Sequence, residues 1–343
     1  MSWLEVEAPG LLTTIQDGRG RPELARYGVA TCGALDAHAA AAANALVGND
    51  AEDAVLEITL IGPTLRFHVL TAFGLAGADL SATLDGQPVA RGWSWLARGG
   101  SRLSFGERRS GARAYLAVAG GFDVPVGLGS RSTDVRAGLG GLAGRPLRAG
   151  DRLSLASPTD AASRGGWYLA AGAAAATQPD PVRVLPGPHL DRFEACALDE
   201  LCSAEWRIGQ QADRMGYRLI GPRLRHARGA DVASLGLPLG AIQVAGDGQP
   251  IVLLADHQPT GGYTVVACVI RADIHLLAQR LPGEAIRFVL TSPDEAREAL
   301  RVRSAALASV ETDTARWDAV RWAGAMPGGL LFGEYRHPGH QPR

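Results

Sequence analysis

Short segments in which apolar and polar residues alternate make up much of the first half of the chain. Residues 3–8, 55–60, 64–69 and 71–76 are such segments, separated by turn pairs such as Pro9-Gly10 and Gly62-Pro63. A period of two predicts strands that bury one face. Residues 80–84 and 87–89 flank Asp85-Gly86, a pair typical of a tight hairpin. The first half is therefore expected to consist of many short strands.

Two other segments predict helices. Residues 36–46 are rich in alanine, with Asp36 as a candidate N-cap and Gly48 just beyond the end. A short helix is expected to begin at Ser292-Pro293, where serine caps the helix and proline takes its first position. These helices are few compared with the predicted strands.

A glycine followed by alternating polar and apolar residues occurs three times. The copies are residues 100–105, 150–155 and 283–288, and each predicts a strand with one buried face. No fixed period links them, so they indicate related β units rather than a solenoid. Strands and helices do not alternate along the chain, and the sheets are expected to be antiparallel or mixed. The patterns predict a mainly β protein with a few helices.

A change of composition between residues 156 and 181 predicts a domain boundary. This segment consists largely of Ala, Gly, Ser, Thr and Pro, and a chain of 343 residues is long for one core. We expect an N-terminal β domain over residues 1–165, a second β domain over 182–303 and a C-terminal extension over 304–343. Because the extension contains Trp317 and Trp322, part of it is expected to pack on the body.

Composition and charge exclude several classes of function. Glycine accounts for 44 residues, which agrees with many tight turns, and the formal net charge is -1 without a basic or acidic block. Neither nucleic acid nor an anionic membrane is therefore an expected partner. No apolar run reaches the length of a membrane span, and the first residues lack the features of a signal peptide. The four cysteines lack metal-ligand spacing and are too sparse for a disulfide framework, so no metal site is expected and reduced thiols in the cytoplasm are.

The chain contains no lysine, and all 34 of its basic residues other than histidine are arginine. A Walker A loop needs a lysine for the phosphates, and a Schiff-base mechanism needs a lysine amine. Biotin is also attached to proteins through a lysine amine. These three kinds of chemistry are therefore excluded for this chain alone.

The segment from residue 240 to residue 263 is the strongest candidate for a functional site. The apolar run Ile251–Ala255 ends in a polar turn that is rich in proline and glycine, as expected at the end of a buried strand. Side chains here offer donors and acceptors suited to a planar amide or urea group, and Gly261-Gly262 allows a close approach to the backbone. The polar residues in question are Gln243, Asp256, Gln258 and Thr260. The alternative is an ordinary turn.

Other segments add weaker candidates. Arg214 and Arg218 can present planar guanidinium groups to a carboxylate or phosphate, or else form a surface loop with ion pairs. Gln16, Asp17 and Arg19 combine amide, carboxylate and guanidinium beside glycines, a pattern that a structural turn also explains.

Two further candidates come from single motifs. The glycine-rich residues 129–141 are suited to an anion-binding nest, while their spacing is wrong for a dinucleotide fingerprint. His257 is a candidate acid or base, although its neighbours spell no catalytic triad.

A series of spaced motifs follows in order along the chain. They are residues 16–19, 33–36, 43–44, 46–49, 56–57, 115–121, 129–133, 140–141, 213–219, 240–243, 248–252 and 256–263. Taken together, these motifs resemble the biotin-dependent carboxyltransferase family, which includes KipA, the C subunit of 5-oxoprolinase and the so-called allophanate hydrolase subunit 2. They also resemble one half of the carboxyltransferase region of urea carboxylase. Cys32 stands where the family usually has serine, His257 and Pro259 interrupt a family motif, and Thr264 replaces a proline.

The resemblance implies cyclophilin-like β-barrel units in two domains and a role within a heteromeric complex. The implied partners are the B subunit of 5-oxoprolinase, which is KipI-like, and the A subunit of the same enzyme. The implied reaction is ATP-dependent opening of 5-oxo-L-proline to L-glutamate, with ATP bound through the complex. If biotin takes part, another polypeptide carries it. KipA-like binding of a KipI-type kinase inhibitor and biotin-dependent carboxyl transfer, as in urea carboxylase, are the alternatives.

The resemblance also implies roles for individual residues. Gln243 and the amides of Gly261 and Gly262 polarise the substrate carbonyl, Asp256 accepts its N–H, and an arginine holds a carboxylate or phosphate. The implied catalytic residues are Asp256, Gln243 and Arg214. The implied substrate-binding residues are Arg218, Gln258, Thr260, Gly261, Gly262, Tyr263, Gln16, Asp17 and Arg19.

Overall fold

Alternating burial along short strands builds the N-terminal half as two stacked antiparallel sheets. The computed structural model describes residues 2–156, 164–168 and 181–316. The six-stranded sheet has the order β11 (Arg152–Ser154), β1 (Trp3–Ala8), β4 (Thr64–Phe67), β9 (Arg102–Ser104), β6 (Thr83–Leu84) and β7 (Gln87–Pro88). The five-stranded sheet has the order β2 (Leu12–Gln16), β3 (Val55–Thr59), β10 (Ser110–Val118), β5 (Thr71–Asp79) and β8 (Trp93–Ala97). Leu4, Phe67 and Phe73 are among the buried side chains of their common core.

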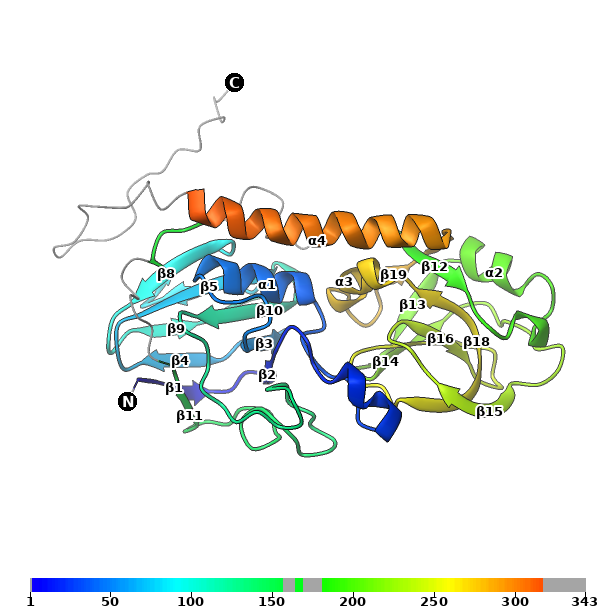
Figure 1. Cartoon of the computed structure of the whole chain (residues 1–343), viewed down its shortest axis with the longest axis horizontal. Helices are drawn as coiled ribbons and strands as arrows, with labels where there is room; N and C mark the ends of the chain where they lie inside the picture. The colour runs from blue at the N-terminus through cyan, green and yellow to red at the C-terminus, as the bar shows by residue number, and fades with distance from the viewer. Residues whose placement is uncertain (1, 157–163, 169–180, 317–343) are drawn as a thin grey trace, which may run out of the picture.

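Helix α1 (Ala37–Leu46) packs on the five-stranded sheet (Figure 1). Alanine has the highest helix propensity, and its small side chain allows a close approach to the strands. Ala40 and Ala43 are fully buried in a cluster with Tyr115. Asp36 accepts a hydrogen bond from the backbone N–H of Ala39 at 3.0 Å, so the predicted helix and its N-cap are confirmed.

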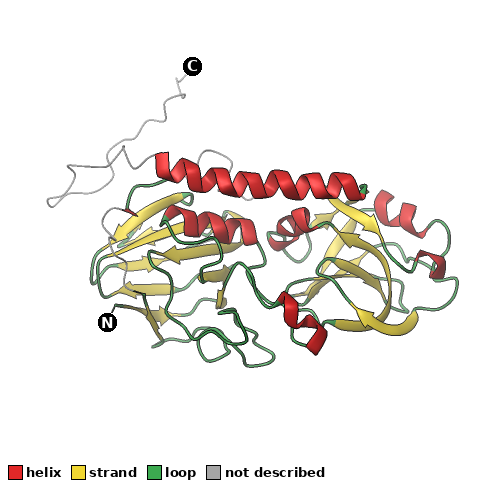
Figure 2. Cartoon of the chain, in the orientation of Figure 1, coloured by secondary structure: helices red, strands yellow, loops and turns green. Residues whose placement is uncertain are grey.

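The C-terminal half contains one nine-stranded sheet that curls into a nearly closed barrel (Figure 2). Its strand pairs are antiparallel apart from β12 with β20. The order is β19 (Ala285–Ile286), β13 (Trp206–Ala212), β14 (Gly216–Ile220), β17 (Pro250–Leu253), β16 (Ala241–Val244), β18 (Thr260–Val269), β12 (Val182–Pro186) and β20 (Phe288–Leu290), while β15 (Asp231–Gly236) pairs with β18. Trp206 and Tyr217 are buried in its core.

Short helical segments complete the described chain. They are η1 (Pro22–Tyr27), η3 (Leu190–Arg192), α2 (Ala197–Ser203), η4 (Arg271–Asp273) and α3 (Ile274–Ala278). The prediction of a mainly β protein with a few helices and barrel-like units is confirmed.

Local sequence signals locate several turns and strands correctly. Asp85 and Gly86 both have positive φ angles and connect β6 to β7, as the hairpin signal predicts. The three glycine-led patterns become β9, β11 and β19. Their apolar residues Leu103, Leu153 and Ile286 are buried, so the prediction of one buried face holds.

Helix α4 (Pro293–Arg316) extends much further than the short helix that the sequence predicts. Its start is as predicted, because Ser292 and Glu295 form a reciprocal capping box. The helix lies across both halves of the molecule and contacts α1 and η4 (Figure 1). The domain limit proposed at residue 303 falls inside this helix. Trp317 and Trp322 lie outside the described residues.

Arg303 anchors α4 on the body. Its Nη1 lies 3.0 Å from Nε2 of His275, and its Nη2 lies 3.9 Å from a carboxylate oxygen of Asp36. Burial, with a further contribution from Arg303, lowers the pKa of His275 to about 4. The neutral ring can therefore accept a hydrogen bond from Arg303 at neutral pH.

The free energy of unfolding is expected to fall as pH drops below about 6.5. In this range His275 binds a proton in the unfolded chain but not in the folded chain, so acid favours the unfolded state. This stabilising contribution is complete above the unfolded pKa and is lost between about 6.5 and 4. His275→Gln keeps a polar group and does not titrate. We expect the loss of Tm between pH 7 and pH 5 to be smaller in this variant by about 3 °C. Equal losses in both proteins, measured by differential scanning calorimetry, would contradict this role.

Candidate functional site

A chain of buried ion pairs joins the two halves at the side of the polar turn. Nη1 of Arg214 lies 2.6 Å from Glu57 of β3, and its Nε and Nη2 each lie 2.8 Å from the carboxylate of Asp256. Nη2 also donates to the carbonyl oxygen of Gly33 at 2.7 Å. The side chains of Glu57 and Arg214 are only 1% and 7% exposed. Arg214 is therefore an internal connection between the halves.

The charges in this chain stabilise one another. Burial alone raises the pKa of Glu57, but Arg214 and Arg113 outweigh it and hold the pKa below its ordinary value. Burial opposes the charge of Arg214, while Asp256 and Glu57 raise its pKa. Glu57 and Arg214 are therefore expected to be ionised at neutral pH, since each buried charge is paired with an opposite one.

Local turns position these side chains. Asp213 accepts a hydrogen bond from the backbone N–H of Met215 at 2.7 Å, a turn that points the intervening Arg214 toward the N-terminal half. The backbone N–H of Asp256 donates to the carbonyl of Arg214 at 2.8 Å, so the two turns are held together. The N–H of Cys32, which has a φ of 55°, donates to Ala255 across the interface at 2.9 Å.

Two further polar side chains, those of Gln279 and Arg113, hold the interface, and no motif in the sequence indicated either of them. Oε1 of Gln279 accepts from the backbone N–H groups of Ala112 and Arg113, and its Nε2 donates to Asp36 and to the carbonyl of Arg113. Arg113 in turn donates to the hydroxyl of Tyr217 at 3.0 Å. A charged residue inside an apolar strand is the sequence signal that can locate such a contact, because charged groups are rarely buried unless they are paired. Both Glu57 and Arg113 satisfy that description.

The carboxylate of Asp256 is the member of the ion-pair chain that approaches solvent. Its side chain is 12% exposed, and a carboxylate has lone pairs beyond those that one guanidinium uses. Gln258 and Thr260, which follow in the same turn, are exposed, and Tyr263 is 43% exposed. We call these residues, which follow one another along the chain from Asp256 to Tyr263, the polar rim. Their contact with a planar N–H and C=O group stays a prediction.

Gln243 does not join this rim. It is 2% exposed, and its Nε2 lies 3.4 Å from the carbonyl oxygen of Tyr263. A Cβ on Gly261 would lie 2.9 Å from Nε2 of Gln243, so the glycine makes room for the amide side chain. Gly261 pairs with Leu235 in the β15–β18 ladder. The geometry therefore supports a role of Gln243 in shaping β18, while its predicted contact with the substrate carbonyl stays a prediction.

The structure gives separate partners to Arg214 and Arg218, which were expected to bind a carboxylate or phosphate together. Arg214 precedes β14, whereas Arg218 lies within the strand and pairs with the exposed Asp247 at 2.8 Å. Four residues of extended chain span about 13 Å. The two guanidinium groups therefore do not form one anion site.

Asp17 occupies the predicted anion-binding nest. Its carboxylate accepts from the hydroxyls of Ser130 and Ser132 at 2.6 and 2.8 Å, and from the backbone N–H groups of Arg131 and Gly20, both at 2.7 Å. Burial opposes its ionisation, but these hydrogen bonds lower its pKa overall. The predicted nest is therefore present, and the anion that it binds is the carboxylate of Asp17 itself.

The neighbours of Asp17 have similar internal or surface roles. Gln16 is fully buried and donates to Thr14 and to the carbonyl of Thr133. Arg19 is exposed and pairs with Glu23. Substrate contacts by Gln16, Asp17 and Arg19 stay a prediction that their present partners do not favour.

His257 is not placed as a free acid or base. It is 3% exposed, and its ring nitrogens lie 2.5 Å and 3.0 Å from the carbonyl oxygens of Leu254 and Leu237. The ring thereby ties the polar turn to the end of β15. Its contacts indicate a structural role beside Asp256.

Other kinds of site find no support in the described part of the chain. Among residues 2–156, 164–168 and 181–316, no group of three His, Cys, Asp or Glu residues is arranged to hold a metal ion. Within the same ranges, no helix combines the length and apolar character that a membrane span requires. All four cysteines are free thiols.

Comparison with known proteins identifies the family. The model of the carboxyltransferase domain, subdomain A and B, matches residues 27–290. The chain belongs to this carboxyltransferase family. It is similar to the 5-oxoprolinase C subunit of Escherichia coli K12, with 43% identity over 86% of this chain and 94% of that protein. It is also similar to the 5-oxoprolinase C subunit of Haemophilus influenzae, with 38% identity over 84% of this chain and 91% of that protein.

The fold of this carboxyltransferase domain is shared with a larger protein. The crystal structure of Kluyveromyces lactis urea carboxylase superposes on 91% of this chain with a TM-score of 0.85 and 32% identity. The chain corresponds to 29% of that protein. The family match includes the ion-pair chain of Glu57, Arg214 and Asp256 and leaves out Asp17.

Proposed function

We propose that this chain is the C subunit of a 5-oxoprolinase, which hydrolyses 5-oxo-L-proline to L-glutamate with ATP together with the A and B subunits. The observation that carries the proposal is the similarity to a protein named as the C subunit of 5-oxoprolinase, at 43% identity over 94% of its length. The match extends over both β halves and the interface between them. A cytoplasmic location is part of the proposal.

Asp256 has the geometry for the substrate contact. A lactam is planar and carries one N–H beside its carbonyl, and the partly exposed carboxylate of Asp256 has acceptor capacity left for that N–H. Arg214 and Glu57 fix the orientation of this carboxylate from behind. Gln258 and Thr260 are exposed beside it and can meet the carbonyl of the same group. We assign Asp256 the contact with substrate and Arg214 a positioning role.

The residues around Asp256 do not fit a nucleoside triphosphate. Such a site needs cationic groups or free amides facing the phosphates, and Arg214 is engaged with Glu57, Asp256 and Gly33. The chain also lacks lysine. We therefore place ATP binding on one of the partner proteins.

The same rim fits the ureido ring of biotin, whose N–H and C=O groups match the donors and acceptors described above. Asp256 and Gln258 would hold such a ring, which supplies a transferable carboxyl group when carried on another polypeptide. The similarity to urea carboxylase favours this second candidate function. KipA-like binding of a kinase inhibitor remains a third alternative, without a structural observation of its own.

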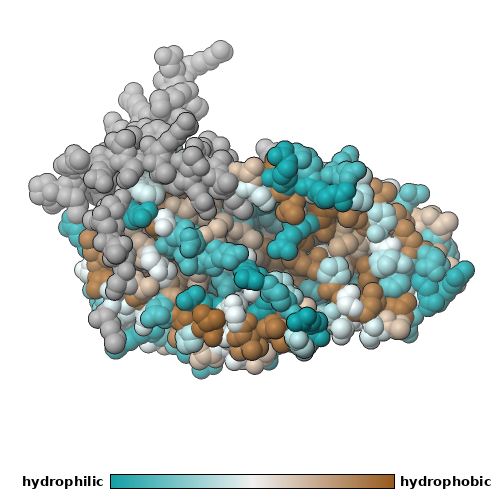
Figure 3. All heavy atoms as spheres, in the orientation of Figure 1, coloured by the Kyte–Doolittle hydropathy of each residue, from teal (hydrophilic) through white to brown (hydrophobic). Residues whose placement is uncertain are grey.

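Exposed apolar residues support the presence of a partner protein. Val126, Leu128 and Val135, which lie between β10 and β11, are 56%, 56% and 44% exposed. Figure 3 shows apolar surface along the edge of the molecule where this segment runs. Contiguous apolar surface of this kind often marks protein interfaces.

Reconstitution tests the proposal. The chain is expected to show no 5-oxoproline-dependent release of glutamate alone, and to restore ATP-dependent release when it is co-expressed with the A and B subunits. Glutamate formation and phosphate release are measured with and without avidin. Avidin-insensitive turnover supports the oxoprolinase, whereas avidin-sensitive turnover of urea supports carboxyl transfer. A stable complex without either activity would reject both enzymes and favour the regulatory role.

A further inference from the structure

A cleft lies in the C-terminal half, at the end of the sheet opposite Asp256. Its volume is about 880 Å³, which is within the range of small-molecule sites. Strand β14 runs from Arg214 toward the cleft residue Pro222, and β17 begins just after the cleft residue Gly248. The length of these strands therefore separates the cleft from the rim at Asp256.

The floor of this cleft is held in place by the fold. The extended segment around Leu224 donates to the carbonyl of Gly248 at 3.0 Å, and on its other side the N–H of Glu194 donates to the carbonyl of Arg225 at 3.0 Å. The ring of His226 stacks on Phe193 with centroids 4.6 Å apart. Leu224 itself is 1% exposed. The cleft is thus formed before any ligand arrives.

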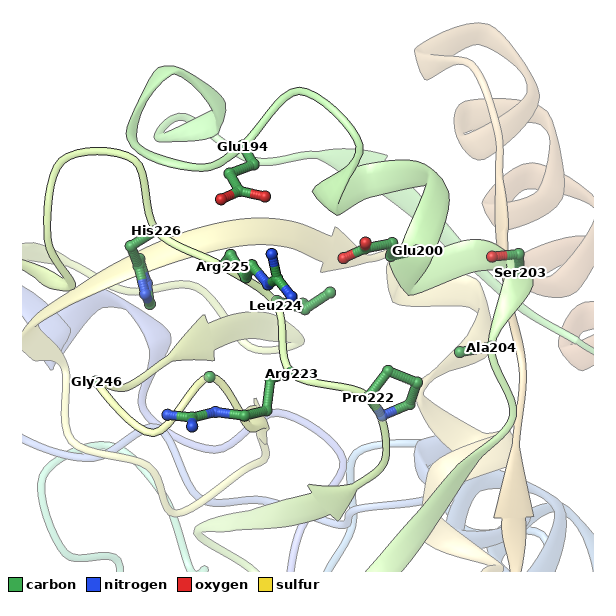
Figure 4. A pocket seen from close by; sticks show the side chains of 11 residues that line it. Glu194, Glu200, Ser203, Ala204, Pro222, Arg223, Leu224, Arg225, His226 and Gly246 are labelled. Carbon is green, nitrogen blue, oxygen red and sulfur yellow. The ribbon is translucent and has the colours of Figure 1, made fainter.

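Charged side chains of both signs surround the opening (Figure 4). Within the described residues, the side chains of Arg225 and Glu194 form no hydrogen bond or ion pair. Glu200 accepts only from the thiol of Cys196, and Arg223 uses its Nε on the carbonyl of Asp247. Burial lowers the pKa of His226, so its ring adds no charge at neutral pH. Two guanidinium groups and two carboxylates therefore face the same volume.

We propose that this cleft binds a small zwitterion, such as an α-amino acid or a short peptide. The guanidinium fork of Arg225 matches a carboxylate, and the carboxylates of Glu194 and Glu200 match an ammonium group. An anionic ligand would be repelled by the two carboxylates, and a cationic ligand would be repelled by the two guanidinium groups. A zwitterion neutralises both sets at once.

The substrate and the product of the proposed reaction supply a discriminating pair of probes, and this choice rests on the proposed function. L-Glutamate carries an ammonium group and two carboxylates. 5-Oxo-L-proline has the same carbon skeleton and keeps one carboxylate, but its nitrogen is a neutral lactam. A cleft that needs both charges binds glutamate and not 5-oxoproline. It would then report product rather than substrate.

The test is isothermal titration calorimetry of the full chain with L-glutamate, trialanine and 5-oxo-L-proline. Glutamate, trialanine or both are expected to bind at least about tenfold more tightly than 5-oxoproline, because a hydrogen-bonded charge contributes on that scale. Tighter binding of L-glutamate would identify a free amino acid as the ligand, and tighter binding of trialanine would identify a peptide. Absence of binding by both zwitterions, or equal binding of 5-oxoproline, would overturn the proposal.

Matched variants locate the binding. Arg225→Gln and Glu194→Gln are each expected to weaken it about tenfold or more. Arg228→Gln and Glu205→Gln remove exposed charges that do not line the cleft and are expected to leave it unchanged. A Cβ on Gly246 meets no atom within 4 Å, so Gly246→Leu is expected to fold and to narrow the cleft. Unchanged affinity in all three cleft variants would refute this location.

The binding test is independent of the enzyme assay. It uses the chain alone and needs neither ATP nor a partner protein. If the reconstituted complex fails to hydrolyse 5-oxoproline while the chain binds glutamate, the proposed function fails and the zwitterion site stands. If the complex is active and no zwitterion binds, only the cleft proposal fails.

Discussion

Arg214→Met is expected to lower the free energy of unfolding by about 3–5 kcal/mol, the cost typical of removing one partner from a buried ion-pair network. Methionine preserves much of the side-chain volume but leaves Glu57 and Asp256 without the cation between them. It also removes the donor to the carbonyl of Gly33. Because these groups come from both halves, the halves are expected to separate more easily. Chemical denaturation followed by tryptophan fluorescence measures the change.

Arg218→Met is the matched control for this loss. Arg218 lies four residues away and pairs with Asp247 at the surface, where the side chains are 41% and 50% exposed. Exposed pairs contribute about 0–1 kcal/mol, so this variant is expected to unfold almost as the unaltered chain does. Equal stability of the two variants would show that the buried network does not connect the halves. Arg214→Lys is expected to recover little, because an ammonium cannot reproduce the bidentate contact.

Asp256→Asn is expected to reduce 5-oxoproline hydrolysis by the assembled complex by about 10–10²-fold, the cost typical of losing one hydrogen bond to a charged group. The substitution keeps the shape of the side chain but replaces a carboxylate oxygen by an N–H donor, which cannot accept the lactam N–H. It also weakens the hold of Arg214 on this turn. Steady-state release of glutamate by the reconstituted complex is the measurement.

Two comparisons separate loss of chemistry from loss of structure in this variant. Asp247→Asn alters an exposed carboxylate that pairs with Arg218 and is expected to retain full activity. Thermal unfolding of Asp256→Asn shows how much folded protein remains at the assay temperature. Near-normal activity in folded Asp256→Asn would remove Asp256 from the site and leave the polar rim without a function.

Local patterns in the sequence predicted the elements that depend on neighbouring residues. The hairpin at Asp85-Gly86 forms because both positions adopt positive φ, and the helix beyond Asp36 begins where a carboxylate caps it. Helix α4 extends further than the sequence predicts because the capping signal at Ser292 indicates only where a helix begins. Its packing against α1 and η4 lies outside any short window of sequence.

The functions of single residues were harder to predict than the elements that carry them. Asp17 has the charge of a ligand-binding group, yet its carboxylate is bound by the hydroxyls of Ser130 and Ser132 and the backbone N–H of Arg131, 113–115 residues away along the chain. His257 lies in the best motif, yet backbone carbonyl oxygens surround its ring. In both cases the polar group can be recognised in the sequence, but its hydrogen-bond partner is known only from the tertiary structure.

The sequence by itself determined the short strands, the tight turns, the polar turn after β17 and the absence of lysine chemistry, because each depends on residues close together in the chain. Only the tertiary structure decided that Arg214 pairs with Glu57 across the interface, that Arg218 pairs with Asp247 at the surface, and that Asp256 is the carboxylate left partly exposed. These contacts join residues 157 and 42 positions apart. A buried charge must find a partner wherever the fold brings one, and no local pattern records which partner that is.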